Sequence, residues 1–242
     1  MIVSTRHQVI LEKEKRWKRR LYRLIPSYRF SNDIYEDAIK ERLGESVRWV
    51  DLGCGRNELI DELSDSGATA VGLDRQTHPQ LLRTPLRFVI GDVNNLPFAD
   101  KSLDLLSAND VFEHLSSPIS ALAEMRRVLK PDGRVIVRTP NVLHPLILIG
   151  RLIPEKLKKR LIYWVFGVLS EDVFPTYYRA NSYGRLMQLC KEAGFHDIKI
   201  QTVEDVHTAY GAFFFLSLFY YHLVNFKPLR YLRTCFVMVA KR

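Results

Sequence analysis

A short apolar strand that leads into a glycine-containing loop constrains the fold of this chain more than any other segment. The apolar run 47–50 ends in Asp51, and Gly53 and Gly55 follow before a predicted helix at 57–66. Glycine lets the backbone turn sharply and approach a ligand closely. The start of the helix suits a carboxylate or a phosphate, and the acid before the loop suits a cationic group. A ligand with both charges is an amino-acid conjugate.

The same loop argues against a nicotinamide dinucleotide. That fingerprint requires G-x-G-x-x-G, and here Glu58 stands where the third glycine should be. A glutamate cannot give the close helix–strand packing that this glycine permits. A glycine turn with no ligand remains the alternative reading of this segment taken alone.

Polar residues follow the next strands in the same way. Asp74 ends an apolar strand 23 positions after Asp51, where an acid can accept hydrogen bonds from ribose hydroxyls. Asp92 follows the run 88–90, near the expected place of an adenine amino group, and Asn109 follows the run 103–108. A solvated loop acid is the simpler explanation of each one singly. Together they predict a ligand site beyond the carboxyl ends of parallel strands.

Strands and helices alternate along the central part of the chain, which predicts an α/β fold with a doubly wound, mostly parallel sheet of seven strands. The segment 131–133 reads as a turn. Helices are predicted at 9–25, 33–43, 57–66, 117–130 and 182–192, and strands at 47–51, 70–74, 87–91, 103–108, 134–139, 198–203 and 235–240.

Five stretches together resemble the class I S-adenosylmethionine (SAM) dependent methyltransferases, and most of all the type 11 branch that includes the ubiquinone and menaquinone methyltransferases. They are VDLGCGRN (50–57), VGLD (71–74), GDVNNLPFAD (91–100), LDLLSANDVFEHL (103–115) and EMRRVLKPDGRVIVRTPN (124–141). The resemblance covers 45–141 well and 182–204 and 235–240 more loosely. It implies a methyltransferase domain at 45–242, interrupted by insertions at 142–181 and 205–234, behind a basic helical extension at 1–44.

The resemblance implies SAM as the cofactor and assigns residues to its parts. The methionine part would contact Asp51, Gly53, Cys54 and Gly55, the ribose Asp74 and Arg75, the adenine Asp92 and Val93, and the sulfonium Asn109. One departure is Asn57, which stands where the family commonly has a third glycine. Asparagine tolerates the left-handed backbone region better than most residues, so we expect the loop to form.

His114, with Glu113 beside it, is the candidate general base for an oxygen nucleophile, because a histidine near neutral pKa can accept a hydroxyl proton. The alternative is that His114 only caps or packs the next helix. Further candidates are Asn141 as a substrate contact, His144 and Tyr178 as substrate contacts or lesser bases, and Arg179 and Arg138 as partners of an anionic substrate group. No cluster of histidines and acids has metal-ligand spacing, so we expect metal-free chemistry.

The net charge of +9 is unevenly distributed. Basic residues gather in 1–30, 151–160 and 226–242, and leave the rest of the chain acidic. Such clusters are typical of nucleic-acid or anionic-membrane contacts, and a solvated basic face is the alternative. The segment after the fourth strand reads Asn109-Asp110-Val111-Phe112 rather than Asn/Asp-Pro-Pro-aromatic, which disfavours methylation of nucleic-acid bases.

The stretch 206–226 contains no charged residue and approaches the length of a membrane span. His207, His222 and Asn225, together with its place between two strands of one sheet, argue against a span. The stretch then forms either a lid over the substrate pocket or an interfacial element, and with the insertion 142–181 it could form an apolar roof over the active site. Aromatics flanked by Lys227 suit a lipid headgroup boundary.

Three separated cysteines and the lack of a signal peptide indicate a reducing, cytoplasmic location. The basic clusters and the aromatic insert favour peripheral attachment to the inner face of a membrane. The leading hypothesis is a SAM-dependent O-methyltransferase acting on a small-molecule, lipid-linked, glycan or quinone-type acceptor at that surface. Two alternatives stay open: an RNA methyltransferase that uses the basic arms, and a non-catalytic SAM-binding module. The oligomeric state does not follow from the sequence.

Overall fold

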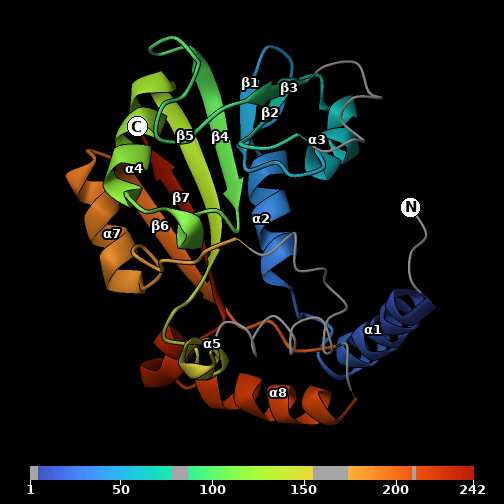
Figure 1. The fold of residues 1–242 in the computed structure, drawn as a ribbon. Coiled ribbons are helices and arrows are strands. Elements are labelled where there is room, and N and C mark those ends of the chain that lie inside the picture. The colour runs from blue at the N-terminus through green and yellow to red at the C-terminus, as the bar shows by residue number, and fades with distance from the viewer. Residues whose placement is uncertain (1–4, 78–86, 155–173, 209–210) are drawn as a thin grey trace. The chain divides into compact units, whose positions relative to one another are not determined.

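The computed structural model describes residues 5–77, 87–154, 174–208 and 211–242. Its centre is a seven-stranded sheet in the order β3-β2-β1-β4-β5-β7-β6 (Figure 1). The pairs β1–β2, β2–β3, β1–β4 and β4–β5 are parallel, and β5–β7 is antiparallel. The strands are β1 (Arg48–Leu52), β2 (Thr69–Asp74), β3 (Phe88–Ile90), β4 (Leu103–Asn109), β5 (Leu129–Pro140), β6 (His196–Val203) and β7 (Cys235–Lys241). The predicted doubly wound, mostly parallel sheet is confirmed.

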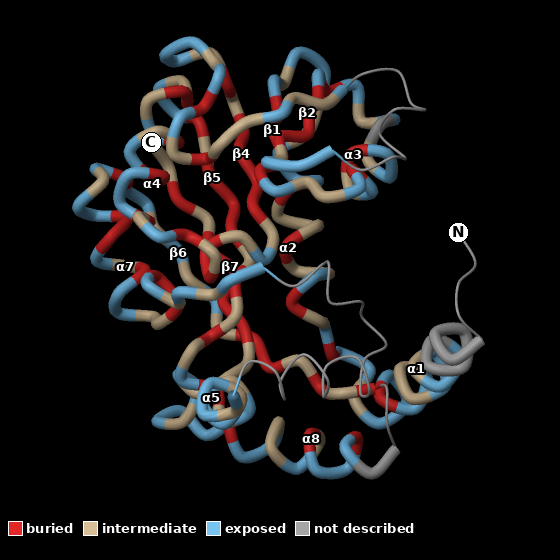
Figure 2. The backbone as a smooth tube through the Cα atoms, viewed as in Figure 1, coloured by how far each residue is buried: buried red, intermediate tan, exposed pale blue. Residues whose placement is uncertain are grey.

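Helices cover the sheet because its central strands are apolar on both faces. Trp49, Val50 and Leu52 of β1 are all buried, as expected for a parallel strand packed from two sides (Figure 2). The helix α4 (Pro118–Val128) packs with α7 (Tyr183–Glu192), and α2 (Ser31–Lys40) packs against β5 and β7 (Figure 1). These helices close the main hydrophobic core.

Two local predictions differ in detail from the structure. The segment 131–133, predicted as a turn, is counted within β5, but Asp132 has a left-handed φ of 70°. Leu103 lies opposite Leu129 while Leu105 lies opposite Arg134, so the residues between Leu129 and Arg134 form an irregularity inside the strand. The helix expected at 57–66 is α3 (Glu58–Glu62), followed by the separate 3₁₀ turn η1 (Ser64–Ser66).

The described chain divides into two compact units. The first comprises Met1–Phe30, Asn141–Pro175 and Thr202–Thr234, and the second holds the sheet. The helix α2 therefore groups with the sheet, although the sequence boundary at 44/45 separated it. Tyr35 and Ile39 of α2 are fully buried, which explains the difference.

The first unit contains α1 (Thr5–Leu24), α5 (Pro145–Leu152), α8 (Gly211–Val224) and the 3₁₀ helix η5 (Lys227–Leu232). Its small core joins Leu21 and Tyr28 to Val206 and Phe214. The Tyr28 hydroxyl donates to the Glu204 carbonyl at 2.7 Å and accepts from the Val206 amide at 2.7 Å. The basic run 156–160 and the aromatic segment 163–166 lie outside the described residues.

None of the helices in the described part of the chain has both the length and the apolar character that a membrane crossing requires. The longest, α1, is strongly charged, and α8 is apolar but has only 14 residues.

Gly72 in β2 generates a stability prediction. A Cβ there would lie 2.1 Å from Asn57 Oδ1 and 2.6 Å from Cys54 Sγ, so Gly72→Ala overpacks the support of the glycine loop. We expect a loss of roughly 1–3 kcal/mol in the free energy of unfolding, measured by denaturant titration. Gly44→Ala is the matched control, because a Cβ at Gly44 meets nothing within 4 Å. Equal stability of the two variants would contradict this packing.

Candidate functional site

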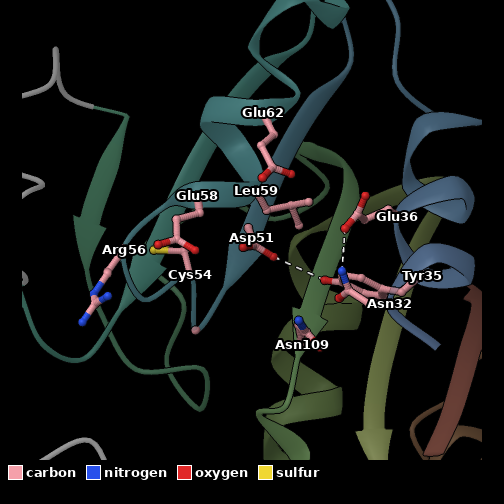
Figure 3. Close-up of a pocket in the computed structure, with 11 residues that line it drawn as sticks. Asn32, Tyr35, Glu36, Asp51, Cys54, Arg56, Glu58, Leu59, Glu62 and Asn109 are labelled. Atoms are coloured by element: carbon pink, nitrogen blue, oxygen red, sulfur yellow. Dashed lines mark hydrogen bonds between the residues drawn. The ribbon is translucent and has the colours of Figure 1, made fainter. Parts of the chain in front are cut away.

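A pocket of about 420 Å³ lies where β1 and β4 end, at the point where the strand order reverses (Figure 3). This is the usual position of ligands in open α/β sheets, and the volume lies in the usual range for ligand pockets. The lining side chains come from α2, the end of β1, the glycine loop, α3 and the end of β4. They belong to Asn32, Tyr35, Glu36, Asp51, Gly53, Cys54, Arg56, Glu58, Leu59, Glu62 and Asn109.

The lining is rich in acids. Glu36, Asp51, Glu58 and Glu62 contribute four carboxyl groups, against the guanidinium of Arg56. Such a concentration of carboxylates raises the local concentration of cations in a cleft. The pocket is therefore suited to a ligand that carries more positive than negative charge.

Glycine is required at one position of the loop and leaves space at another. Gly53 has a φ of 71°, and a Cβ there would lie 2.4 Å from Val111 Cγ2. Its amide donates to the Leu73 carbonyl at 2.7 Å, which fixes the loop on β2. Gly55 has a φ of 54°, and in the described part of the chain no atom lies within 4 Å of an added Cβ. A ligand can approach this backbone closely.

Asn57 takes the left-handed conformation that the sequence required, with a φ of 65° and a ψ of 20°. Its side chain is buried, and its Oδ1 has no hydrogen-bond partner among the described residues. The missing Cβ of Gly72 provides the room for this side chain and for that of Cys54. The loop thus closes with an asparagine in place of a third glycine.

Asp51 is buried at the end of β1, and a chain of hydrogen bonds orients it. Trp49 Nε1 donates to Ser107 Oγ at 2.7 Å, and Ser107 Oγ donates to Asp51 Oδ1 at 2.6 Å. The hydroxyl of Tyr35 lies 3.5 Å from the same oxygen (Figure 3). Burial raises the pKa of Asp51 to about 7, although both hydrogen bonds oppose the rise. The carboxyl group therefore changes charge near neutral pH and is ready to ionise beside a cation.

The residues assigned to adenosine lie at or just after the ends of β2 and β3 and are not among those that line the pocket. Asp74 accepts hydrogen bonds from the amides of Gly55 at 2.9 Å and Gln76 at 3.1 Å, so it supports the glycine loop. Arg75 Nη2 lies 3.4 Å from Asp92 Oδ2. Hydrogen bonds from Asn94 lower the pKa of Asp92. The roles of Asp74, Arg75 and Asp92 in binding adenosine, and that of the buried Val93, stay predictions.

Asn109 lines the pocket and is held from behind by Arg138. Arg138 Nη1 donates to Asn109 Oδ1 at 2.9 Å and to Asp110 Oδ2 at 2.6 Å, and its Nε donates to Ser31 Oγ at 2.7 Å. These contacts give Arg138 a role in positioning the end of β4. An anionic substrate group would have to compete with them.

Glu113 and His114 belong to the short 3₁₀ helix η3 (Phe112–His114), and His114 Nε2 lies 3.9 Å from Glu113 Oε1. Glu113 is buried and accepts a hydrogen bond from Thr139 Oγ1 at 3.2 Å. Asn181 Nδ2 in turn donates to Thr139 Oγ1 at 2.7 Å. Burial, with a further contribution from Asp110, raises the pKa of Glu113 to about 8. Glu113 is therefore mostly neutral at pH 7 and acts as a hydrogen-bonding partner in this cluster.

The remaining predicted substrate residues divide between the two units. Glu113 also fixes the segment near Tyr178, since its carbonyl accepts from the amide of Tyr178 at 3.1 Å. Arg179 Nη1 donates to the Ser116 carbonyl at 2.6 Å. These residues share the sheet unit with His114, while Asn141 and His144 belong to the other unit.

Asn141 anchors the chain locally. Its Nδ2 donates to the carbonyls of Tyr231 and Arg233, both at 2.7 Å, and its Oδ1 accepts from the Leu143 amide at 3.0 Å. His144 is buried beside Glu204. Substrate contact by either residue stays a prediction.

Sequence reasoning missed the contribution of α2. Asn32, Tyr35 and Glu36 line the pocket from this helix, which was expected only as part of a basic extension. Their spacing places them on one face of a helix, and this was the available signal. Thr139 and Asn181, which support Glu113, were missed too, because they are far apart in the sequence.

Comparisons with known proteins agree with this geometry. The profile of a family described as "Methyltransferase domain" matches residues 50–137. A demethylmenaquinone methyltransferase of Beutenbergia cavernae is 36% identical over 105 residues, which are 42% of this chain and 43% of the relative. One of Corynebacterium kroppenstedtii is 32% identical over 157 residues, 62% of this chain and 66% of the relative. This chain thus spans less than half the length of the first of these relatives.

A solved structure shares the fold. It is that of a SAM-dependent methyltransferase of Thermotoga maritima described as a possible histamine N-methyltransferase. The two chains superpose with a TM-score of 0.59 at 19% identity, over 96% of this chain and 99% of the other.

The raised pKa of Glu113 generates a prediction on stability. A buried acid that holds its proton up to about pH 8 favours the folded state below the unfolded pKa of about 4.3, and this stabilisation is lost as the pH rises towards 8. Glu113→Gln has no such proton to lose. Its free energy of unfolding relative to the wild type should therefore rise between roughly pH 5 and 8, by up to about 1.4 kcal/mol per pH unit.

Denaturant titrations at several pH values measure this difference. Glu41→Gln, the same change at an exposed position, should follow the wild-type profile. A constant difference between Glu113→Gln and the wild type at every pH would show that Glu113 titrates at its ordinary pKa.

Proposed function

The chain belongs to the class I SAM-dependent methyltransferases, and from this premise we propose that it binds SAM in the acid-rich pocket and transfers the methyl group to an acceptor. The observation that carries the proposal is the buried Asp51 at the mouth of a glycine loop, among four carboxyl groups. SAM carries a sulfonium and an ammonium against one carboxylate. A pocket with an excess of acids suits this net positive charge.

The lining residues divide between the charges of such a ligand. We assign the ammonium group to Asp51 and the adjoining part of the methionine moiety to Gly53 and Cys54, which line the pocket with it. Arg56 is a lining group that can pair with the carboxylate. Asn109, fixed by Arg138, is proposed to lie beside the sulfonium.

When bound, SAM supplies an electrophilic methyl group, so the protein has to align the acceptor, exclude water and accept a proton. We assign proton acceptance from an oxygen nucleophile to the imidazole of His114. Glu113, 3.9 Å away, orients that ring while its own carboxyl group is mostly neutral. Thr139 and Asn181 hold Glu113 in place.

The acceptor is proposed to be lipid-linked and to be methylated at a membrane surface. In the first unit, Leu152 is 85% exposed and Phe219 and Phe226 are each 67% exposed. The basic residues of α1 belong to the same unit. There the ring centroids of Trp17 and of Phe214 in α8 lie 4.6 Å apart. Apolar side chains together with basic ones are typical of an interfacial surface. Both relatives compared above are named as demethylmenaquinone methyltransferases.

One prediction of this proposal concerns the pH dependence of SAM affinity. Because Asp51 is protonated below about pH 7 and a cation favours its ionised form, affinity should increase as the pH rises from 5.5 to 7, by up to roughly tenfold per pH unit. The increase should level off above pH 7. Calorimetric titration with SAM at each pH measures it.

Asp51→Asn should bind SAM weakly and with a flat pH profile. Asp61→Asn, the same change at an exposed position of α3, should keep the wild-type profile. Identical profiles for Asp51→Asn and the wild type would refute the role of Asp51. Absence of any SAM binding would refute the proposed function.

Another prediction of this proposal concerns transfer of the methyl group to the acceptor. Purified chain incubated with cell membranes, cellular RNA and SAM labelled in its methyl group should place label in the fraction that organic solvent extracts. His114→Ala should keep its SAM affinity and lose roughly 10²–10⁴-fold in rate, the usual worth of a general base. His196→Ala, at an exposed position, is the control. Label in RNA alone would favour the RNA alternative, and full activity of His114→Ala would assign that residue to packing.

A further inference from the structure

Helix α8 is apolar on both of its faces. Phe214 and Val224 point into the first unit and are at most 1% exposed, whereas Phe215, Leu216 and Phe219 on the other face are between 60% and 67% exposed. A helix that is apolar all round is normally covered on every side. The outward face of α8 is therefore suited to a partner that is itself apolar.

Helix α5 adds a second apolar surface in the same unit, next to α8 (Figure 1). None of the residues of α5, all of which the structure describes, is buried. Leu146, Ile149 and Leu152 are 50%, 57% and 85% exposed. Apolar side chains that gather in this way mark a contact with another molecule.

A pocket of about 250 Å³ lies between these two helices and the segment that follows β6. Leu146, Phe213, Leu216 and Phe219 line it, and each of them is at least 50% exposed. The pocket therefore opens through the apolar surface of α5 and α8. An apolar cavity of about 150 Å³ can hold benzene and stay free of water, so this space corresponds to roughly eight to ten carbon atoms.

The polar side chains of the lining are engaged within the chain. The Tyr220 hydroxyl donates to the last carbonyl of η5 at 2.8 Å, and Ser217 Oγ accepts from the His207 amide at 2.9 Å. His144 and Glu204 are each only 4% exposed, so they offer an occupant almost no surface. The walls hold an occupant by apolar contact, which favours a hydrocarbon chain over a polar molecule.

Basic residues border this apolar surface. Arg151 stands in the last turn of α5, and Lys227 and Arg230 belong to η5, which follows α8; all three are exposed. The described segments 141–154 and 211–234 contain no acid. A second copy of this chain would bring like charges together. Apolar side chains with a basic border instead suit the interface of an anionic membrane.

We propose that α5 and α8 bind one hydrocarbon chain of an anionic membrane lipid, with the end of the chain in the pocket and the head group at the border of Arg151, Lys227 and Arg230. The assignment rests on the membrane surface proposed above and adds the site that selects a lipid by its chain. SAM affinity and flotation on anionic vesicles, measured on the same protein, separate the two failures. If both persist while the pocket takes no chain, only the assignment made here is wrong.

Calorimetry on the full chain tests the occupant with n-alkyl phosphates of four to twelve carbons, below the concentrations at which they form micelles. Burial of one methylene group contributes about fourfold in affinity. Affinity should therefore rise by that factor per carbon up to roughly eight to ten carbons, where the pocket is full, and much less beyond. A rise by the same factor through the whole series would place the chain on the open surface and overturn the proposal.

The sign of the head group is tested at constant chain length. Octyl phosphate should bind roughly tenfold more tightly than octyltrimethylammonium, because each basic residue near an anionic group contributes a similar factor at most. Equal affinities would contradict the role of the basic border.

Three variants locate the chain. Leu216→Trp and Leu146→Trp fill the pocket from α8 and from α5, and both positions are at least half exposed, so the fold should tolerate them. Each should lower the affinity for octyl phosphate at least tenfold. Leu152→Trp makes the same change on α5 at a position that is not among those lining the pocket, and it should bind as the wild type does. Equal affinities of all three variants would show that the chain lies outside the pocket.

Vesicles test the membrane as the source of the chain. They contain phosphatidylcholine and a phosphatidylglycerol that carries a photoreactive diazirine at the end of one chain. Illumination should label wild-type peptides that contain Leu146 or the segment 213–220, and Leu216→Trp should lose this label. Binding of octyl phosphate without labelling, or labelling that Leu216→Trp leaves unchanged, would overturn the proposal.

Discussion

A buried carboxyl group at the end of the central strand organises the sheet unit. Asp51 is 4% exposed, and a buried acid is costly unless other groups hold it. Three elements provide those groups: Trp49 on β1, Ser107 on β4 and Tyr35 on α2. Ser107 lies directly opposite Asp51 in the β1–β4 register, so the pairing of the two strands and the orientation of the acid are the same constraint. A shift of register by one residue would move the serine to the other face of the sheet.

The glycine loop depends on neighbours that are distant in sequence. Gly53 has to lack a side chain because Val111, after β4, occupies that space, and Gly72 on β2 has to lack one because Cys54 and Asn57 do. Asp74 then ties the Gly55 amide to the end of β2. The loop is thus fixed by strands on both sides of β1, and this explains how Asn57 can replace the third glycine although its Oδ1 finds no hydrogen-bond partner within the ranges that the structure describes.

The sequence predicted the sheet well because its signals are local. Each central strand is an apolar run that ends in a polar residue, and glycines mark the loop. The sequence did not predict α2 as a wall of the pocket, since Asn32 and Glu36 look like any solvated helix face until the helix is packed against β5 and β7. Glu58 and Glu62 of α3 were not predicted as lining residues either, because they too look like a solvated helix face in the sequence. The turn residues at 131–133 bend the chain only locally: Asp132 has a φ of 70°, and the pairing with β4 resumes at Arg134. Proline and glycine indicate the bend, but the neighbouring strands decide that the chain does not reverse there.

The first unit shows a different limit. Its three segments are far apart in the sequence and are joined by pairs such as Trp17 with Phe214, and Tyr28 with Glu204 and Val206. No local sequence pattern predicts such pairs. The sequence therefore indicated an extension at 1–44 and two separate insertions at 142–181 and 205–234 rather than one unit. The same limit applies to His144, which was expected as a substrate contact and is found in a pocket of its own unit. His144 Nε2 lies 3.7 Å from Glu204 Oε1, and its ring centroid lies 5.3 Å from that of Tyr220. These partners come from segments some sixty and seventy-six positions further along the chain, so only the folded unit brings them together.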